Sequence, residues 1–164
     1  MTNEQVSIRK FQSEDKPAII EILKATNVFS EEEITIAIEL MDEFLQKPHQ
    51  EDYDLYSAVS EEGQVIGYYC AGPTPLTHGT FDLYWIAVKP DCHKQGVGRL
   101  LNTHCEELVK SLGGKLIVAE TSSKPNYEAT RRFYHLQGYQ EVANIKNYYK
   151  PGDDLVIFGK YVQQ

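Results

Sequence analysis

Cysteine, long apolar runs and positive charge are all scarce in this sequence. Its three cysteines, Cys70, Cys92 and Cys105, form no Cys-x-x-Cys pair. A chain of 164 residues is large enough to fold without disulfides, so this usage favours a reducing compartment. No apolar run approaches the about 18 residues that a membrane helix needs, and Glu4 stands within Met1–Ile8, where a signal peptide would be basic and then apolar. These absences predict a cytoplasmic protein with no membrane partner.

The balance of charge is negative. Aspartate and glutamate number 24 against 16 lysines and arginines, which gives a formal net charge of -8. Non-specific binding to nucleic acid depends on counterions released by lysine and arginine, so no nucleic-acid partner is expected. A cationic partner fits this charge better. The five histidines lack the spacing of metal ligands, and no metal site is predicted.

Several catalytic signatures are also missing. No glycine-rich run is followed by Lys-Ser/Thr, as a Walker loop would be, and the third glycine of a dinucleotide-binding fingerprint is absent. No Gly-x-Ser-x-Gly run is present either, so a serine hydrolase is not supported. The chemistry therefore has to be sought elsewhere.

The apolar periods predict the element order β-α-α-β-β-β-α-β-α-β-β. The first helix is expected to be capped by Ser13, with Pro17 in its first turn, and the second to start at the capping box Ser30-Glu33 and end before Pro48. Crossover helices among strands imply an α/β fold, with a largely antiparallel, partly parallel sheet in a single domain, 1–164. Strands are predicted at Val6–Phe11, Tyr53–Ser60, Gln64–Ala71, Thr80–Val88, Leu116–Ala119, Gln140–Tyr148 and Leu155–Val162, and the later helices at Val97–Leu112 and Asn126–Leu136.

The junction after the strand Thr80–Val88 carries the clearest chemical signal. Gly96 and Gly98 allow a tight turn and a close approach of a ligand to the main chain. The unpaired N–H groups of the following helix, with the positive end of its dipole, offer a seat for a phosphate, and Lys94 and Arg99 add positive charge. Taken alone, this Gly-x-Gly run is also compatible with a plain tight turn.

Two landmarks in order make the pattern more specific. The run His93-Lys94-Gln95-Gly96-Val97-Gly98 follows the apolar triplet Ile86-Ala87-Val88, and a later helix ends in Phe133-Tyr134-His135-Leu136-Gln137-Gly138-Tyr139. With these runs the sequence resembles the GNAT superfamily of N-acetyltransferases over nearly its whole length. The resemblance implies a GNAT-like mixed sheet flanked by helices and acetyl-CoA as cosubstrate.

The resemblance also implies roles for particular residues. The cofactor's pyrophosphate would rest on His93, Lys94, Gln95, Gly96, Val97, Gly98 and Arg99, and its pantetheine arm would pair with the main chain of Ile86, Ala87 and Val88. Tyr134 matches the position of the general acid. Asp82 and Glu120 match carboxylate positions that serve as base in different members of the family, and a water chain without a single base is a third alternative.

The function expected from this resemblance is transfer of the acetyl group of acetyl-CoA to a primary amine, by direct attack in a ternary complex. The acceptor would be a small molecule or a peptide amine. The alternative is a non-catalytic acyl-CoA-binding regulatory module with the same fold. The sequence leaves open the acceptor, the acyl-chain length and whether the chain forms a homodimer.

Overall fold

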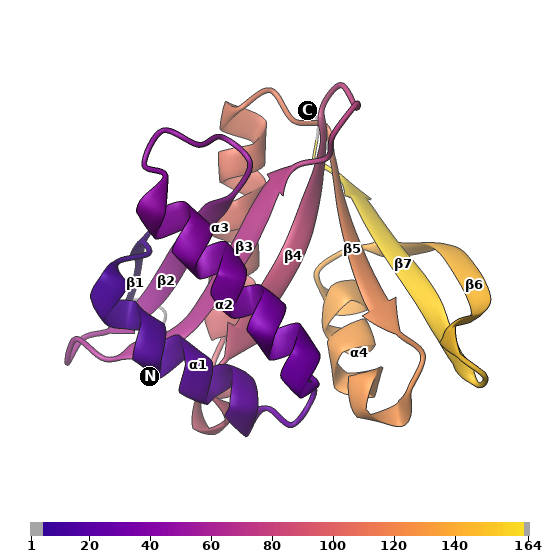
Figure 1. Ribbon diagram of the computed structural model, residues 1–164, viewed down its shortest axis with the longest axis horizontal. Coiled ribbons are helices and arrows are strands. Elements are labelled where there is room, and N and C mark those ends of the chain that lie inside the picture. The colour runs from indigo at the N-terminus through magenta and orange to yellow at the C-terminus, as the bar shows by residue number, and fades with distance from the viewer. Residues whose placement is uncertain (1–4, 163–164) are drawn as a thin grey trace. The chain divides into compact units, whose positions relative to one another are not determined.

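The computed structural model describes residues 5–162. Met1 to Glu4, part of the segment on which the absence of a signal peptide was argued, lie outside the described residues. The elements follow the predicted order (Figure 1). The strands are β1 (Val6–Lys10), β2 (Asp54–Ser60), β3 (Val65–Pro73), β4 (Thr80–Val88), β5 (Leu116–Ser122), β6 (Gln140–Lys150) and β7 (Asp153–Tyr161). The α-helices are α1 (Lys16–Ala25), α2 (Glu31–Gln46), α3 (Val97–Ser111) and α4 (Glu128–Leu136).

The strands form a seven-stranded sheet in the order β1-β2-β3-β4-β5-β7-β6. β1 with β2, β2 with β3, β5 with β7, and β6 with β7 are antiparallel pairs, whereas β4 and β5 run parallel. A parallel pair needs a crossover, and α3 supplies it. The predicted α/β fold with a largely antiparallel, partly parallel sheet is therefore confirmed.

The chain divides into two compact units. The first unit comprises Met1–Gly72 and Trp85–Cys105, and the second comprises Pro73–Tyr84 and Glu106–Gln164. β4 and α3 each contribute residues to both units. The single domain expected over 1–164 stays a prediction.

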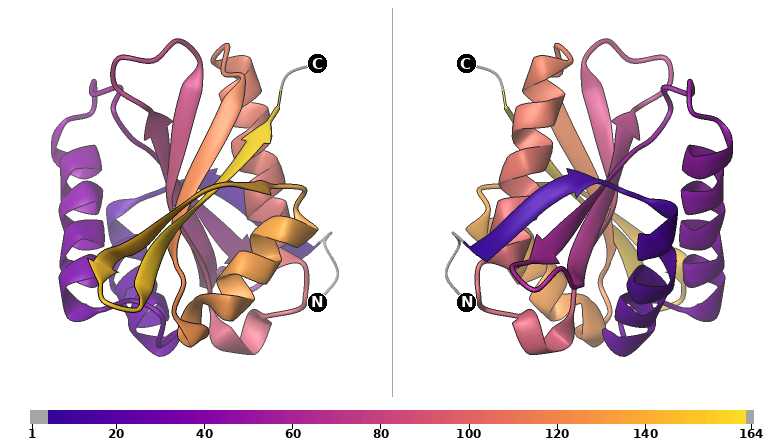
Figure 2. Two further views of the ribbon diagram at one scale, coloured as in Figure 1. Left: turned by 90° about the vertical axis from the view of Figure 1, so that its right-hand side faces the viewer. Right: turned by 90° about the vertical axis from the view of Figure 1, so that its left-hand side faces the viewer.

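In the first unit, α1 and α2 lie side by side and bury their apolar faces together with residues of β2 and β3 (Figure 2). This burial removes large aliphatic and aromatic side chains from water, which is the main favourable contribution to folding. The buried cluster consists of Phe11, Ile19, Ile22, Leu23, Ile34, Ala37, Met41, Leu55, Tyr68, Cys70 and Ala87.

The second unit is built on β5 and β7, which pair over seven residues from Leu116↔Tyr161 to Ser122↔Leu155. β6 pairs with the other edge of β7, so β6 is an edge strand. α4 lies against this sheet through Tyr134, whose ring stacks on Phe158 at a centroid distance of 5.5 Å.

The first helix starts later than predicted. Ser13 begins a short 3-10 turn, Ser13–Asp15, and α1 begins at Lys16, so the expectation that Ser13 caps the helix is wrong. The cause is Asp15, whose carboxylate accepts hydrogen bonds from Arg9, the Gln12 amide and the Ser57 hydroxyl and so is tied to β1 and β2. Pro17 does lie in the first turn of α1, as predicted.

The second helix starts as expected, because Ser30 accepts a hydrogen bond from the amide of Glu33 at 3.1 Å. Other bounds differ by a few residues. β5 continues to Ser122 since it pairs with β7 to its end, and Pro125–Tyr127 forms a 3-10 turn ahead of α4. Within residues 5–162, the helices are all too short or too polar to cross a lipid bilayer.

Candidate active site

The link between β4 and α3 turns tightly through two residues in left-handed backbone conformation. After β4 ends at Val88, the amide of Lys89 donates to the carbonyl of Ile66 at 2.8 Å. Lys94 then has a φ of 64° and Gly96 a φ of 84°. Glycine adopts this conformation readily, whereas for lysine it costs about 1–2 kcal/mol. The loop is therefore held in one specific path into α3.

The first turn of α3 presents backbone N–H groups that the helix does not use. The amide of Leu100 donates to the carbonyl of Gly96 at 3.0 Å, which is the first bond of the helical pattern. The amides of Val97, Gly98 and Arg99 come before this bond, so geometry leaves them without a partner inside the helix. Arg99 is exposed beside them. Unpaired amides, the positive end of the helix dipole and a cationic side chain suit an anionic phosphate group.

Two side chains of the loop, His93 and Gln95, form hydrogen bonds to backbone carbonyls before it. His93 donates from Nε2 to the carbonyl of Val88 at 2.8 Å, which ties the loop to the end of β4. Gln95 donates from Nε2 to the carbonyl of Asp91 at 3.2 Å, but its Oε1 is buried and finds no donor among the described residues. A buried acceptor without a donor is energetically costly.

In the first unit, the end of β4 packs closely against β3. A Cβ added to Gly67 on β3 would stand 2.9 Å from the carbonyl oxygen of Ala87, so the two strands approach closely at this point. The side chain of Ala87 is buried, while Ile86 and Val88 are partly exposed. In the second unit, β4 pairs with β5 over Thr80–Asp82.

In the second unit, Asp82 on β4 and Glu120 on β5 lie on the same face of the parallel pair. Asp82 is in register with Val118, and Glu120 follows Val118 by two residues, so alternation returns its side chain to that face. Thr74, directly after β3, donates its hydroxyl to Asp82, with 2.7 Å between Oγ1 and Oδ2. Two of the three predicted catalytic residues are thus neighbours.

The surroundings of Glu120 raise its pKa. The residue remains accessible to solvent, but partial burial of the carboxyl raises its pKa, and the negative charge of Asp82 adds to this rise. A carboxylate whose pKa is raised toward neutrality is a stronger base and a better proton acceptor near neutral pH. Glu120 is therefore chemically suited to accept a proton.

Tyr134 lies on the other face of the β5–β7 pair. Its ring stacks on Phe158, which is in register with Ala119, the neighbour of Glu120 that points to the opposite face. Tyr139 packs edge-on against the Tyr134 ring, with 5.1 Å between the two ring centroids. The Tyr134 residue is buried, with 4% of its surface exposed. The phenol ring is fixed by aromatic contacts, and its predicted role as an acid stays a prediction.

The structure thus groups the predicted residues in two sets. His93 to Arg99 form one continuous segment of the first unit, a loop followed by the first turn of α3, while Asp82, Glu120 and Tyr134 belong to the second unit. The sequence did not predict a role for Thr74. The hydroxyl of Thr74 is visible in the sequence, but its hydrogen-bond partner, Asp82, lies eight residues further along the chain, across a loop.

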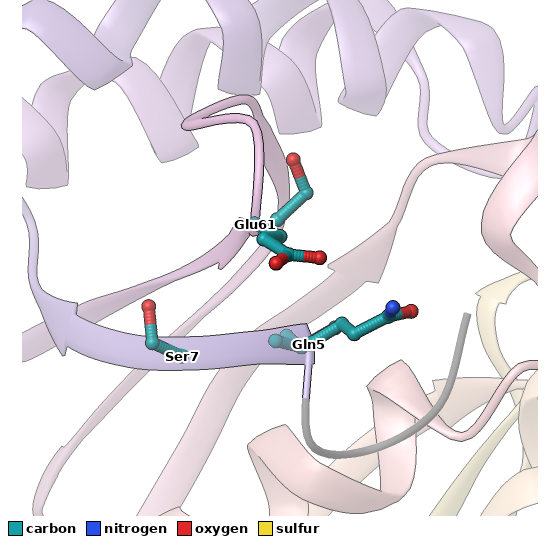
Figure 3. Close-up of a pocket in the computed structure, with 5 residues that line it drawn as sticks. Gln5, Ser7 and Glu61 are labelled. Carbon is teal, nitrogen blue, oxygen red and sulfur yellow. The ribbon is translucent and has the colours of Figure 1, made fainter.

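A small pocket lies elsewhere, at the start of β1, with a volume of about 280 Å³ (Figure 3). Gln5, Ser7 and Glu61 line it, together with Val6 and Ser60. None of these residues belongs to the predicted site, and the pocket is shallow and open. The pocket therefore adds no residue to the predicted loop and carboxylate pair.

The cysteines give no sign of redox or metal chemistry in the part of the chain that the structure describes. Cys70, Cys92 and Cys105 are buried and form no disulfide there. Burial is the main cause that raises the pKa of the Cys92 thiol, so it is a weak nucleophile despite its place beside the loop. Between residues 5 and 162, no three His, Cys, Asp or Glu side chains are grouped as a metal site would require.

Comparison with known proteins identifies the class. The sequence matches the model of the acetyltransferase (GNAT) family over residues 17–139, a stretch that includes the loop, both carboxylates and Tyr134. The chain therefore belongs to the GNAT family, whose members are acyltransferase enzymes.

Individual relatives agree with this assignment. A proposed GNAT-family acetyltransferase from Desulfovibrio desulfuricans is 38% identical with a TM-score of 0.91, over 96% of this chain and 99% of that one. An uncharacterized N-acetyltransferase of Methanocaldococcus jannaschii is 27% identical over 100 residues, which are 60% of this chain. The match spans 61% of that relative's length, less than two thirds of it.

A more distant structure shares the fold. A proposed acetyltransferase from Salmonella typhimurium, solved with its cofactor acetyl-CoA, is 18% identical with a TM-score of 0.73, over 98% of this chain and 95% of that chain. At this identity the likeness concerns the fold alone.

Proposed function

We propose that this chain is a single-domain N-acetyltransferase that moves the acetyl group of acetyl-CoA to a primary amine by direct attack. The observation that carries the proposal is the β4–α3 junction, where the amides of Val97, Gly98 and Arg99 begin α3 without a partner inside the helix, in a segment that matches the family's pattern. Acetyl-CoA would supply the acyl group as a reactive thioester. Membership of the GNAT family and a related fold solved with acetyl-CoA support this choice of cosubstrate.

The residues divide into a binding set and a proton-transfer set. His93 to Arg99 bind the phosphates, with Lys94 and Arg99 adding charge, and the main chain of Ile86 to Val88 offers a strand edge to the extended arm of the cosubstrate. On the acceptor's side, Asp82, Glu120 or a water chain takes a proton from the ammonium group, because only the neutral amine is nucleophilic. Tyr134 is the proposed donor of a proton to the departing thiolate.

The acceptor is proposed to be a cationic small molecule or a peptide amine. The net charge of -8 favours cations, and Asp82 and Glu120 supply negative charge at one place on β4 and β5. The three cysteines are buried and form no disulfide within residues 5–162, which is consistent with a cytoplasmic location.

A non-catalytic acyl-CoA-binding module is the second candidate, favoured by one observation: the binding loop is complete within the first unit, so binding alone does not require the carboxylates. Turnover separates the two candidates. Purified protein is incubated with acetyl-CoA and a panel of amines, and free thiol is measured. The enzyme releases thiol only with particular amines, whereas a binding module releases none although calorimetry detects bound acetyl-CoA.

Matched variants test whether the activity depends on the proposed site. Gly98→Asp, which puts a side chain and a negative charge in the phosphate seat, is expected to abolish acetyl-CoA binding. Removing both candidate carboxylates, in Asp82→Asn/Glu120→Gln, is expected to retain acetyl-CoA binding and lower turnover. Thiol release that survives in both variants would place the chemistry outside the proposed site.

A further inference from the structure

Thr74 is fixed by contacts on both sides of its backbone. Its N–H donates to the carbonyl of Thr80 at 2.8 Å, and its own carbonyl accepts the hydroxyl of Thr77 at 2.6 Å. Pro75 follows, and a residue before proline is restricted to extended conformations. The direction of the Thr74 side chain is therefore set by the loop that joins β3 to β4.

The Thr74 hydroxyl meets one oxygen of the Asp82 carboxylate at 2.7 Å. A hydrogen bond to one carboxylate oxygen fixes the orientation of the carboxylate. Because a carboxylate has about four lone-pair positions, Asp82 keeps capacity to accept further hydrogen bonds, such as those of an ammonium group.

Glu120 has a different environment. β7 places Ile157 in register with it, and the flanking residues on that face of β7 are Leu155 and Gly159, none of which carries charge. From β4, the charged neighbour is Asp82, and burial together with this charge raises the pKa of Glu120. Two carboxylates with such unlike surroundings are suited to different tasks.

We infer that Thr74 is a positioning residue. Its hydroxyl holds the Asp82 carboxylate in the orientation that binds the acceptor's ammonium group. Glu120 is then left to accept the proton. This inference rests on the proposed function. An N–H bond of the ammonium breaks, its electron pair stays on nitrogen, and the proton passes to a carboxylate oxygen of Glu120. The lone pair attacks the thioester carbonyl carbon and forms the C–N bond, and the C–S bond breaks with its electrons leaving on sulfur. The nitrogen gives up a second N–H proton and the thiolate takes up one proton, so the products are a neutral amide and a free thiol.

Substitutions of Thr74 test the positioning role through the separate kinetic constants. Thr74→Val keeps the shape and removes the hydroxyl, and it is expected to raise KM for the amine about tenfold while kcat and KM for acetyl-CoA change little. Thr74→Ser, which keeps the hydroxyl, is expected to restore KM. A purely structural role would lower the melting temperature of the Val variant without this selective rise in KM, and an unchanged KM would overturn the inference.

A second measurement needs no activity. The side-chain carboxyl of Glu120 is titrated by ¹³C NMR in the wild type and in Asp82→Asn. Removal of the neighbouring charge is expected to lower the pKa of Glu120, and in the active enzyme the acid limb of the kcat/KM profile should move to lower pH with it. An unchanged titration of Glu120 would overturn the division of roles. If the wild type acetylates no amine, the proposed function fails, and the titration still decides whether Asp82 acts on Glu120.

Discussion

Asp15 joins the start of α1 to two strands of the first unit, and its removal is expected to destabilise the fold strongly. The side chain is 2% exposed and accepts two bonds from Arg9, at 2.7 and 2.9 Å, and one each from the Gln12 amide and the Ser57 hydroxyl. Since Arg9 is 35% exposed, its ion pair contributes only about 1 kcal/mol. Loss of the acceptor for Gln12 costs about 1 kcal/mol, and the fully buried Ser57 hydroxyl left unpaired costs about 1–2 kcal/mol. Asp15→Ala should therefore lower the free energy of unfolding by about 3–4 kcal/mol.

The stabilisation that Asp15 provides should depend on pH. Burial alone would raise the pKa of Asp15, but the hydrogen bonds from Arg9, Gln12 and Ser57 outweigh it and the pKa lies below its ordinary value. The unfolded chain thus takes up the proton at higher pH than the folded chain, so the stabilisation is complete above the ordinary pKa and is lost as pH falls through the lowered one.

The pH-dependent stabilisation by Asp15 is measured by urea unfolding of the wild type and of Asp15→Asn between about pH 7 and about pH 2. Asparagine has nearly the same shape as aspartate but no charge. The difference in free energy of unfolding should be largest near neutrality and shrink in acid. A difference that stays constant over this range, or an Asp15→Ala cost below about 1 kcal/mol, would refute the reasoning.

Three further predictions concern the loop, the proposed acid and a packed glycine. Gly98→Asp should leave the protein folded and remove acetyl-CoA binding in calorimetry, and unchanged affinity would mean that the phosphates bind elsewhere. Tyr134→Phe keeps the aromatic packing and should lower kcat by about 10² to 10⁴ with little change in acetyl-CoA affinity, whereas a stable and fully active variant would remove Tyr134 from the mechanism. Gly114→Ala places a methyl group 2.3 Å from Cγ1 of Val109 and 2.8 Å from the Phe81 ring, so it should cost about 1–3 kcal/mol in urea unfolding, and a neutral effect would show that these side chains give way easily.

The element order could be predicted because the apolar periods are strong along most of the chain. The predicted helix Val97–Leu112, however, extends past the end of α3 at Ser111, because Leu112 lies beyond the helix and is 55% exposed. The buried stripe runs through residues four apart, Val97, Leu101, Cys105 and Val109. Leu100, Leu108 and Leu112 form a row beside this stripe, so the apolar pattern in the sequence is broader than the fully buried face.

Local motifs predicted where chemistry is concentrated, but not which side chains meet. The start of α1 could not be predicted because Asp15 is fixed by Ser57, 42 residues away. The bond from Thr74 to Asp82 depends on the loop between β3 and β4, and the neighbourhood of Asp82 and Glu120 depends on strand register. The ring of Tyr134 lies on the opposite face from Glu120 because α4 packs through Phe158, a contact that periodicity alone does not reveal.

The most direct test of the proposed function follows the acetyl group itself. Protein is mixed with acetyl-CoA labelled in the acetyl group and with an amine that releases thiol in the panel, and the label is located by mass spectrometry. The account predicts label on the amine nitrogen in an amount equal to the thiol released, with none retained on the protein when the amine is left out. Label recovered as free acetate, or held covalently on the protein, would contradict direct acetyl transfer to an amine.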